Sequence, residues 1–66
     1  MYAAGTQVTF QYRQHQILGG ALISGAGTVL DWTMVGTDRA YVIQPEEGPV
    51  VHVRTAGVRP INEVQQ

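Results

Sequence analysis

The sequence contains no cysteine and no lysine. Without cysteine, disulfide bonds and thiolate metal sites are excluded. The two histidines, His15 and His52, have no carboxylates at ligand spacing, so we expect no metal site. A chain of 66 residues buries only about 60 % of the surface that its unfolded form exposes, and small folds without disulfides or metals often gain stability by association.

Charge is also scarce. Charged residues make up 14 % of the chain and apolar residues 44 %, whereas an ordinary soluble domain is about 25 % charged. Part of the surface must therefore be covered in some other way. Because homo-oligomers are the commonest soluble assemblies, we expect copies of the chain to cover it, as a dimer or tetramer.

The net charge of −1, with arginine as the only strong base, makes nucleic acid an unlikely partner, because phosphate contacts need an excess of positive charge. Binding through Arg13, Arg54 and Arg59 beside aromatic residues stays open as an alternative. Residues 1–5 lack the basic and apolar regions of a secretory signal. The longest apolar stretch, residues 17–23, is too short to cross a bilayer, so we expect a cytoplasmic protein.

Short strand patterns follow one another along the chain. Strict alternation of apolar and polar residues predicts a half-buried strand from Thr6 to Arg13. The glycine-rich residues 17–27 predict a loop and a short, bent second strand, since glycine disfavours helix. Residues 28–35 carry apolar groups on both faces, with Leu30, Trp32 and Met34 on one of them, which is typical of a central strand packed on two sides.

Turn residues separate the remaining strands. Residues 36–39 predict a turn and residues 40–44 a strand, and Pro45 to Pro49 form the clearest turn of the chain. Residues 50–54 then predict a return strand. After a tight turn at residues 55–57, residues 58–61 predict a short edge strand, where Pro60 is tolerated. The whole chain, 1–66, is thus expected to be one all-β domain, a small five-stranded SH3-like barrel with a frayed tail at 62–66.

The expected contact surface lies on the strand of residues 50–54. Val51 and Val53 are the natural core pair, so His52 shares the opposite face with Val50 and Arg54 and points toward solvent or a partner. Copies of His52 and Arg54 meeting around a symmetry axis could form an anion or pH-sensitive site.

The aromatic residues allow two interpretations. Trp32, Tyr41, Tyr12 and Phe10 could line a groove for an extended peptide, but in so small a domain the core needs most of the large aromatics. Val50, Trp32 and Tyr41 join His52 and Arg54 as candidate ligand or partner contacts.

The catalytic inventory is poor. Ser24 is the only serine, and Asp38, Glu46 and Glu47 fall in predicted turns. No nucleophile, base and acid combination is available, so no catalytic residues are assigned. We expect a non-catalytic, homo-oligomeric interaction module without a cofactor, in which a protein partner could contact the surface that carries His52 and Arg54.

The second half of the chain, from Gly27 to Asn62, resembles the plasmid-encoded type B dihydrofolate reductases. The stretch Gly27 to Trp32 matches a Gly-x-aliphatic-aliphatic-x-Trp pattern of that family, and residues 40–42 fall where the family has a tyrosine-containing strand. Val58, Ile61 and Asn62 also fit.

The resemblance implies an SH3-like barrel, a homotetramer around a central pore and, as the alternative function, an oxidoreductase that orients folate-like ligands and NADPH in that pore. The family's active run is Val-Gln-Ile-Tyr, assisted by a lysine. Here residues 50–53 read Val-Val-His-Val, so no reductase site residue carries over.

Overall fold

The computed structural model describes residues 2–13 and 20–61, which form five antiparallel strands and one short 3₁₀ turn. Their bounds are β1 Gln7–Arg13, β2 Leu22–Val35, β3 Asp38–Pro45, β4 Val51–Arg54, η1 Thr55–Gly57 and β5 Val58–Pro60. The predicted all-β class and the five strands are confirmed. The predicted tail at 62–66, like His15, lies outside the described residues.

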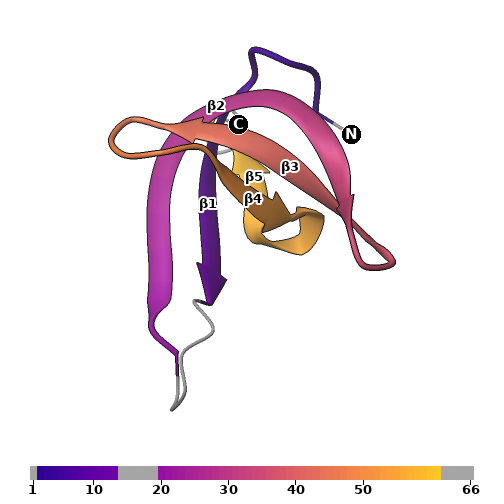
Figure 1. Cartoon of the computed structure of the whole chain (residues 1–66). Helices are drawn as coiled ribbons and strands as arrows, with labels where there is room; N and C mark the ends of the chain where they lie inside the picture. The colour runs from indigo at the N-terminus through magenta and orange to yellow at the C-terminus, as the bar shows by residue number, and fades with distance from the viewer. Residues whose placement is uncertain (1, 14–19, 62–66) are drawn as a thin grey trace.

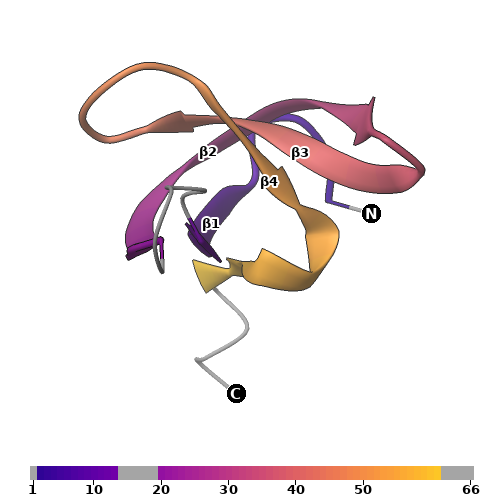
Figure 2. The ribbon, with the colours of Figure 1, turned by 60° about the horizontal axis from the view of Figure 1, so that its bottom comes forward.

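The strand order is β4-β3-β2-β1-β5, so β4 and β5 are the two edges of one sheet. Figure 1 shows β2 arching from its partner β1 across to β3. The η1 turn then leads the chain from β4 back toward β1, where β5 pairs (Figure 2). The sheet curls but is not closed into the predicted barrel, because β4 and β5 do not pair within the described part of the chain.

One long strand replaces the two shorter strands that the sequence predicts up to residue 35, and residues 17–19 of the predicted loop lie outside the described residues. β2 runs unbroken from Leu22, pairing with β1 along its first half and with β3 along its second. Glycine weakens a strand but also permits close approach of another backbone. At Gly27 a side chain would overlap the carbonyl oxygen of Gln44, so glycine is needed where β3 meets β2.

A β-bulge interrupts the β2–β3 ladder. Val29 pairs with Ile43 and Asp31 pairs with Val42, which leaves Leu30 as the extra residue. A bulge inserts one residue and bends the strand, so the alternation of faces changes at this point. Trp32 consequently pairs with Tyr41, although simple counting from Val29 would place it on the opposite face.

The two hairpins follow the predicted turn chemistry. Gly36 has a φ of 64° and no described non-glycine residue has a positive φ, as expected for a two-residue type II′ turn between Val35 and Asp38. Gly48, with a φ of 98°, turns the chain between β3 and β4. Both predicted hairpins are therefore confirmed, with β4 beginning at Val51 instead of Val50.

The core lies inside the curl of the sheet. Its buried side chains form one cluster, Val8, Phe10, Val29, Tyr41, Ile43, Val53 and Val58. Ile43 is fully buried, and such burial contributes about 1.5–3 kcal/mol per aliphatic side chain. Val53 is buried and Val51 packs against the cluster, as predicted.

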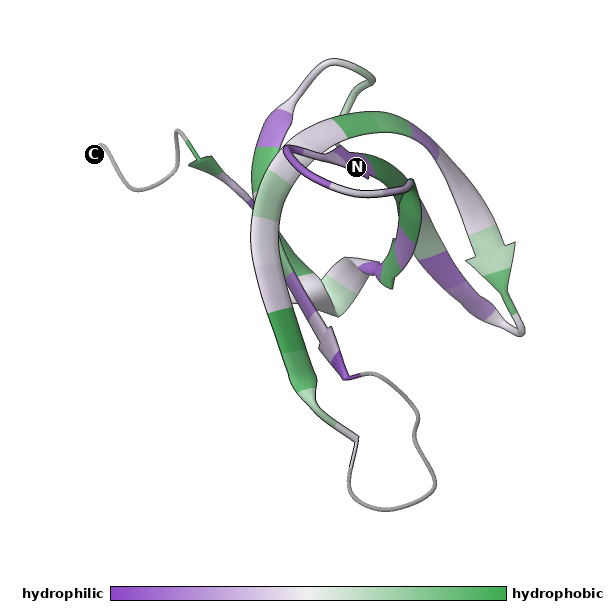
Figure 3. Ribbon diagram, turned by 60° about the vertical axis from the view of Figure 1, so that its left-hand side comes forward, coloured by the Kyte–Doolittle hydropathy of each residue, from purple (hydrophilic) through white to green (hydrophobic). Residues whose placement is uncertain are grey.

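The second half of β2 is not packed on both sides, in contrast to the prediction. Leu30, Trp32 and Met34 are 46 %, 48 % and 50 % exposed. β1 does not continue past its pairing with the first half of β2. The second half therefore extends beyond the part of the sheet that encloses the core. Figure 3 shows both ends of β2 projecting from the curl, with apolar segments at each end.

The close approach at Gly27 predicts a graded stability effect. Gly27→Ala should lower the free energy of unfolding by about 1–3 kcal/mol, because the added methyl group meets rigid backbone of β3. Gly25→Ala should cost less, since its methyl group meets only the end of the Phe10 ring at 3.1 Å. Urea unfolding of both variants measures this, and equal stabilities would contradict the close approach.

Candidate functional site

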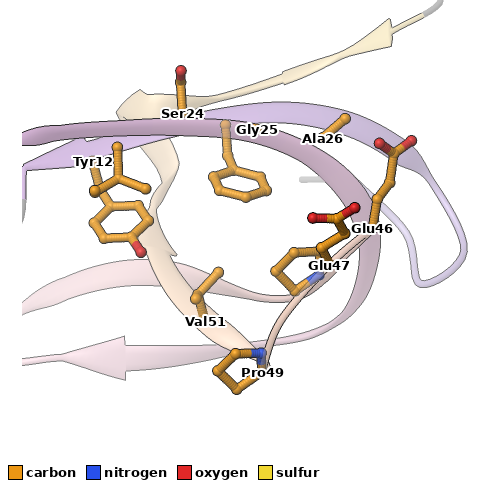
Figure 4. A pocket seen from close by; sticks show the side chains of 11 residues that line it. Tyr12, Ser24, Gly25, Ala26, Glu46, Glu47, Pro49 and Val51 are labelled. Carbon is orange, nitrogen blue, oxygen red and sulfur yellow. The ribbon is translucent and has the colours of Figure 1, made fainter.

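A groove opens where the first half of β2 diverges from the β3–β4 turn. It has a volume of about 420 Å³ and is lined by Phe10, Tyr12, Ile23, Ser24, Gly25, Ala26, Pro45, Glu46, Glu47, Pro49 and Val51. Figure 4 shows Tyr12 at one end, the carboxylates of Glu46 and Glu47 at the other, and Pro49 and Val51 between them. We call this the β2 groove. Its surface is about equally polar and apolar, and among the described residues the charged ones that line it are both acidic.

The aromatic residues at the β2 groove are held by the core. The rings of Phe10 and Tyr12 lie 6.2 Å apart at 21°, because residues two apart on β1 share a face. Phe10 is buried and Tyr12 is half-buried. Gly25 lies beneath the Phe10 ring, and any side chain there would press on the ring. The floor of the groove is therefore continuous with the core.

A second hollow, of about 520 Å³, brings together residues that the sequence places far apart. His52 and Arg54 of β4 line it together with Arg13 of β1, and Tyr12 forms part of its wall. The sequence predicts His52 and Arg54 on one face but gives no sign that Arg13 lies beside them. The pairing of β1 with β2 and β5 produces this proximity, and no local pattern reveals it.

Arg54 is already paired. Its Nε lies 3.2 Å from Oδ2 of Asp38, and the two side chains are 57 % and 60 % exposed. Such an exposed ion pair contributes little to stability. It nevertheless offsets one of the two arginine charges at the hollow, so the hollow is only weakly cationic.

The predicted contact residues do not form one site. His52 and Arg54 are exposed on β4 and Val50 is exposed just before it. Tyr41 is buried, its ring stacked on Tyr2 at 5.4 Å and its hydroxyl accepting a hydrogen bond from the Tyr2 backbone N–H at 2.9 Å. Tyr41 is thus a core residue in this chain.

Trp32 belongs to a separate surface, the apolar strip of Trp32 and Met34 on the second half of β2. The sequence predicts that Leu30 shares this face, but the bulge leaves it on the other one. The Arg39 guanidinium lies 5.7 Å from the centre of the Trp32 ring, a cation–π arrangement. The Trp32 backbone N–H donates to Oδ1 of Asp31 at 2.8 Å. This backbone donor is therefore satisfied within its own strand, while the side chain stays exposed.

The β2 groove as a unit is not predicted from the sequence. The predicted peptide groove combines Phe10 and Tyr12 with Trp32 and Tyr41, instead of with the prolines and glutamates of residues 45–49. The signal that could have found it is the Pro-Glu-Glu-Gly-Pro turn at residues 45–49, which places apolar rings and two carboxylates together.

Comparisons with protein-family models, curated proteins and solved structures find no match. The resemblance to type B dihydrofolate reductases therefore stays a prediction. Within the described residues, no helix is long and apolar enough to span a membrane. In the same ranges, no group of three or more histidine, cysteine, aspartate or glutamate side chains is placed to hold a metal ion.

Two substitutions separate core from surface among the predicted contact residues. Tyr41→Phe should lower the free energy of unfolding by about 1 kcal/mol, because the Tyr2 N–H loses its acceptor. His52→Ala should change it by less than about 0.5 kcal/mol, because the side chain is exposed. Thermal unfolding measures both, and a large loss with His52→Ala would contradict its surface position.

Proposed function

We propose that the chain is a non-catalytic interaction module, built on an SH3-like arrangement of five strands, that assembles with copies of itself. The strand order β4-β3-β2-β1-β5, with a 3₁₀ turn before β5, supports the SH3-like arrangement. This strand order suits a binding module and an oligomeric enzyme equally, so the choice between them depends on the surfaces. A cytoplasmic location is part of the proposal.

The observation that carries self-assembly is the apolar strip. Trp32 and Met34 leave about half of their surface in water, and exposed groups of large apolar side chains mark interaction surfaces. Both lie on one face of β2, since Trp32 pairs with Tyr41 and Met34 with Arg39. Tyr41 and Arg39 are two residues apart on β3 and share a face.

A second copy of the chain is the occupant we propose for this strip. The net charge is only −1, so two copies repel each other weakly. Arg39 covers part of the Trp32 ring, and cation–π pairs and aromatic side chains are common at protein interfaces. Charged residues make up only 14 % of the chain, too few to cover the apolar surface. Contact between two such strips would bury part of that surface.

The residue inventory supports a binding role over catalysis. Ser24 lines the β2 groove whereas His52 lines the other hollow, so the one serine and this histidine are not part of a common site. The surface that carries His52 and Arg54 remains the proposed contact for a further protein partner.

Self-assembly through the strip predicts a specific loss. The Trp32→Ser and Met34→Ser double variant should sediment as a monomer at micromolar concentration, while the parent chain sediments as a dimer or tetramer. Leu22→Ser is the matched control, because Leu22 is 57 % exposed at the other end of the same strand and should leave assembly unchanged. A monomeric parent chain would refute the proposal, and an assembled double variant would refute the strip.

A further inference from the structure

Part of β2 in the β2 groove has an edge with no strand partner among the described residues, as the directions of its backbone N–H and carbonyl groups show. The Val29 N–H donates to the carbonyl of Thr6, and the Val29 carbonyl accepts from the Gly5 N–H, so Val29 faces the β1 side. The Ala26 carbonyl accepts from the Glu46 N–H, so Ala26 faces the β3 side. Backbone directions alternate along a strand. Leu22 and Ser24 therefore face the same side as Ala26.

No described strand lies beside Leu22 and Ser24 on that side. The β2–β3 ladder begins at Gly27, paired with Pro45, and Glu46 makes the last contact at Ala26. Among the described residues, the backbone N–H and carbonyl groups of Leu22 and Ser24 thus have no strand partner on this side. Unpaired strand edges of this kind are templates for the addition of another strand.

The rest of the β2 groove suits such a strand. Side chains of an added strand would point alternately into the groove and away from it. Those that point inward would meet the apolar wall of Phe10, Tyr12, Ile23 and Val51. The edge at Trp32 differs, because Asp31 already satisfies its backbone N–H.

The charge of the β2 groove indicates the kind of segment that it binds. Among the described residues, Glu46 and Glu47 are the only charged ones that line the β2 groove, and neither forms an ion pair with another of them. They lie together beyond Ala26, at the end of the groove where the β3–β4 turn begins (Figure 4). A basic residue of a bound segment could pair with these carboxylates, whereas an acidic segment would be repelled.

We infer that the β2 groove binds an extended, basic protein segment, which adds as a strand to the free edge at Leu22 and Ser24 and places positive charge beside Glu46 and Glu47. This names a partner class for the proposed interaction module and uses a surface other than the apolar strip. Main-chain hydrogen bonds provide affinity in this mode of recognition, and the alternating pockets and charges provide specificity.

The test uses the full chain and a short fluorescein-labelled peptide in which valine alternates with serine and lysines stand at both ends. Fluorescence anisotropy at low ionic strength should show saturable binding that weakens with added salt, as expected for charge pairs. The same peptide with glutamates in place of the lysines should bind at least about tenfold more weakly. Equal affinity for the two peptides, or no saturable binding of either, would overturn the inference.

Ser24→Pro tests the strand edge itself. Proline removes the N–H that faces the groove, and it is tolerated at an edge where that N–H is not part of a ladder. The variant should bind the lysine peptide about tenfold more weakly, while Ser24→Ala, which keeps the N–H, should bind within about twofold of the parent chain. Unchanged binding by Ser24→Pro would show that no strand is added there.

The carboxylates provide a second, independent variant in case proline disturbs folding. Glu46→Gln with Glu47→Gln should weaken binding of the lysine peptide about fivefold. Asp31→Asn with Asp38→Asn changes the net charge equally at residues that do not line the groove, and it should bind like the parent chain. If both double variants weakened peptide binding equally, the effect would be one of overall charge, and the assignment of the site to Glu46 and Glu47 would be refuted.

The outcome is separable from that of the proposed self-assembly. The Trp32→Ser and Met34→Ser variant alters only the apolar strip and should bind the lysine peptide with the affinity of the parent chain. Loss of binding in that variant would mean that the peptide occupies the strip instead, which would overturn the assignment to the β2 groove.

Discussion

The structure depends on one strand that serves two ladders. β2 pairs with β1 from Leu22 to Thr28 and with β3 from Gly27 to Val35, so the two ladders overlap only at residues 27 and 28. Gly27 permits the close approach of β3 at this overlap. The bulge at Leu30, just beyond the overlap, bends the strand. The core collects beside the overlap, where Val29 is almost fully buried.

The two proposed surfaces are consequences of this arrangement. Each half of β2 is paired on one side only, which leaves one open edge near Ser24 and an exposed face near Trp32. At the first, the end of β3 and the β3–β4 turn add Pro45, Pro49 and two carboxylates. At the second, Arg39 and Asp31 occupy positions around Trp32. The same bend thus produces a peptide-sized groove at one end of the strand and an apolar strip at the other.

Much of the fold could be predicted from local patterns. The alternation around Phe10 specifies β1, and Gly36 and Gly48 specify the turns, because only glycine adopts their positive φ readily. Pro60 fits the edge strand β5. The backbone groups of Arg59, which pairs with Thr9, face β1, and those of the next residue face away from it. Pro60 therefore lacks an N–H only where no described strand lies.

The errors have a common physical origin in β2. Its glycines suggested a break, but they are accommodated because Phe10 and the Gln44 carbonyl occupy the space of the missing side chains. The bulge at Leu30 changed the face of Trp32, which no alternation pattern reveals. The candidate site was therefore predicted only in part. His52 and Arg54 are exposed as expected, whereas Tyr41 belongs to the core and the β2 groove depends on contacts between distant residues.

Amide hydrogen exchange of β2, followed residue by residue by NMR, tests the division between the two ladders most directly. We expect slow exchange for Ile23 and Gly25, because their N–H groups face β1. We expect fast exchange for Leu22 and Ser24, because their N–H groups face the open edge. Slow exchange at Ser24 in the unliganded chain would contradict the free edge. It would also contradict the central claim that the first half of β2 pairs with β1 on one side and has no described strand partner on the other.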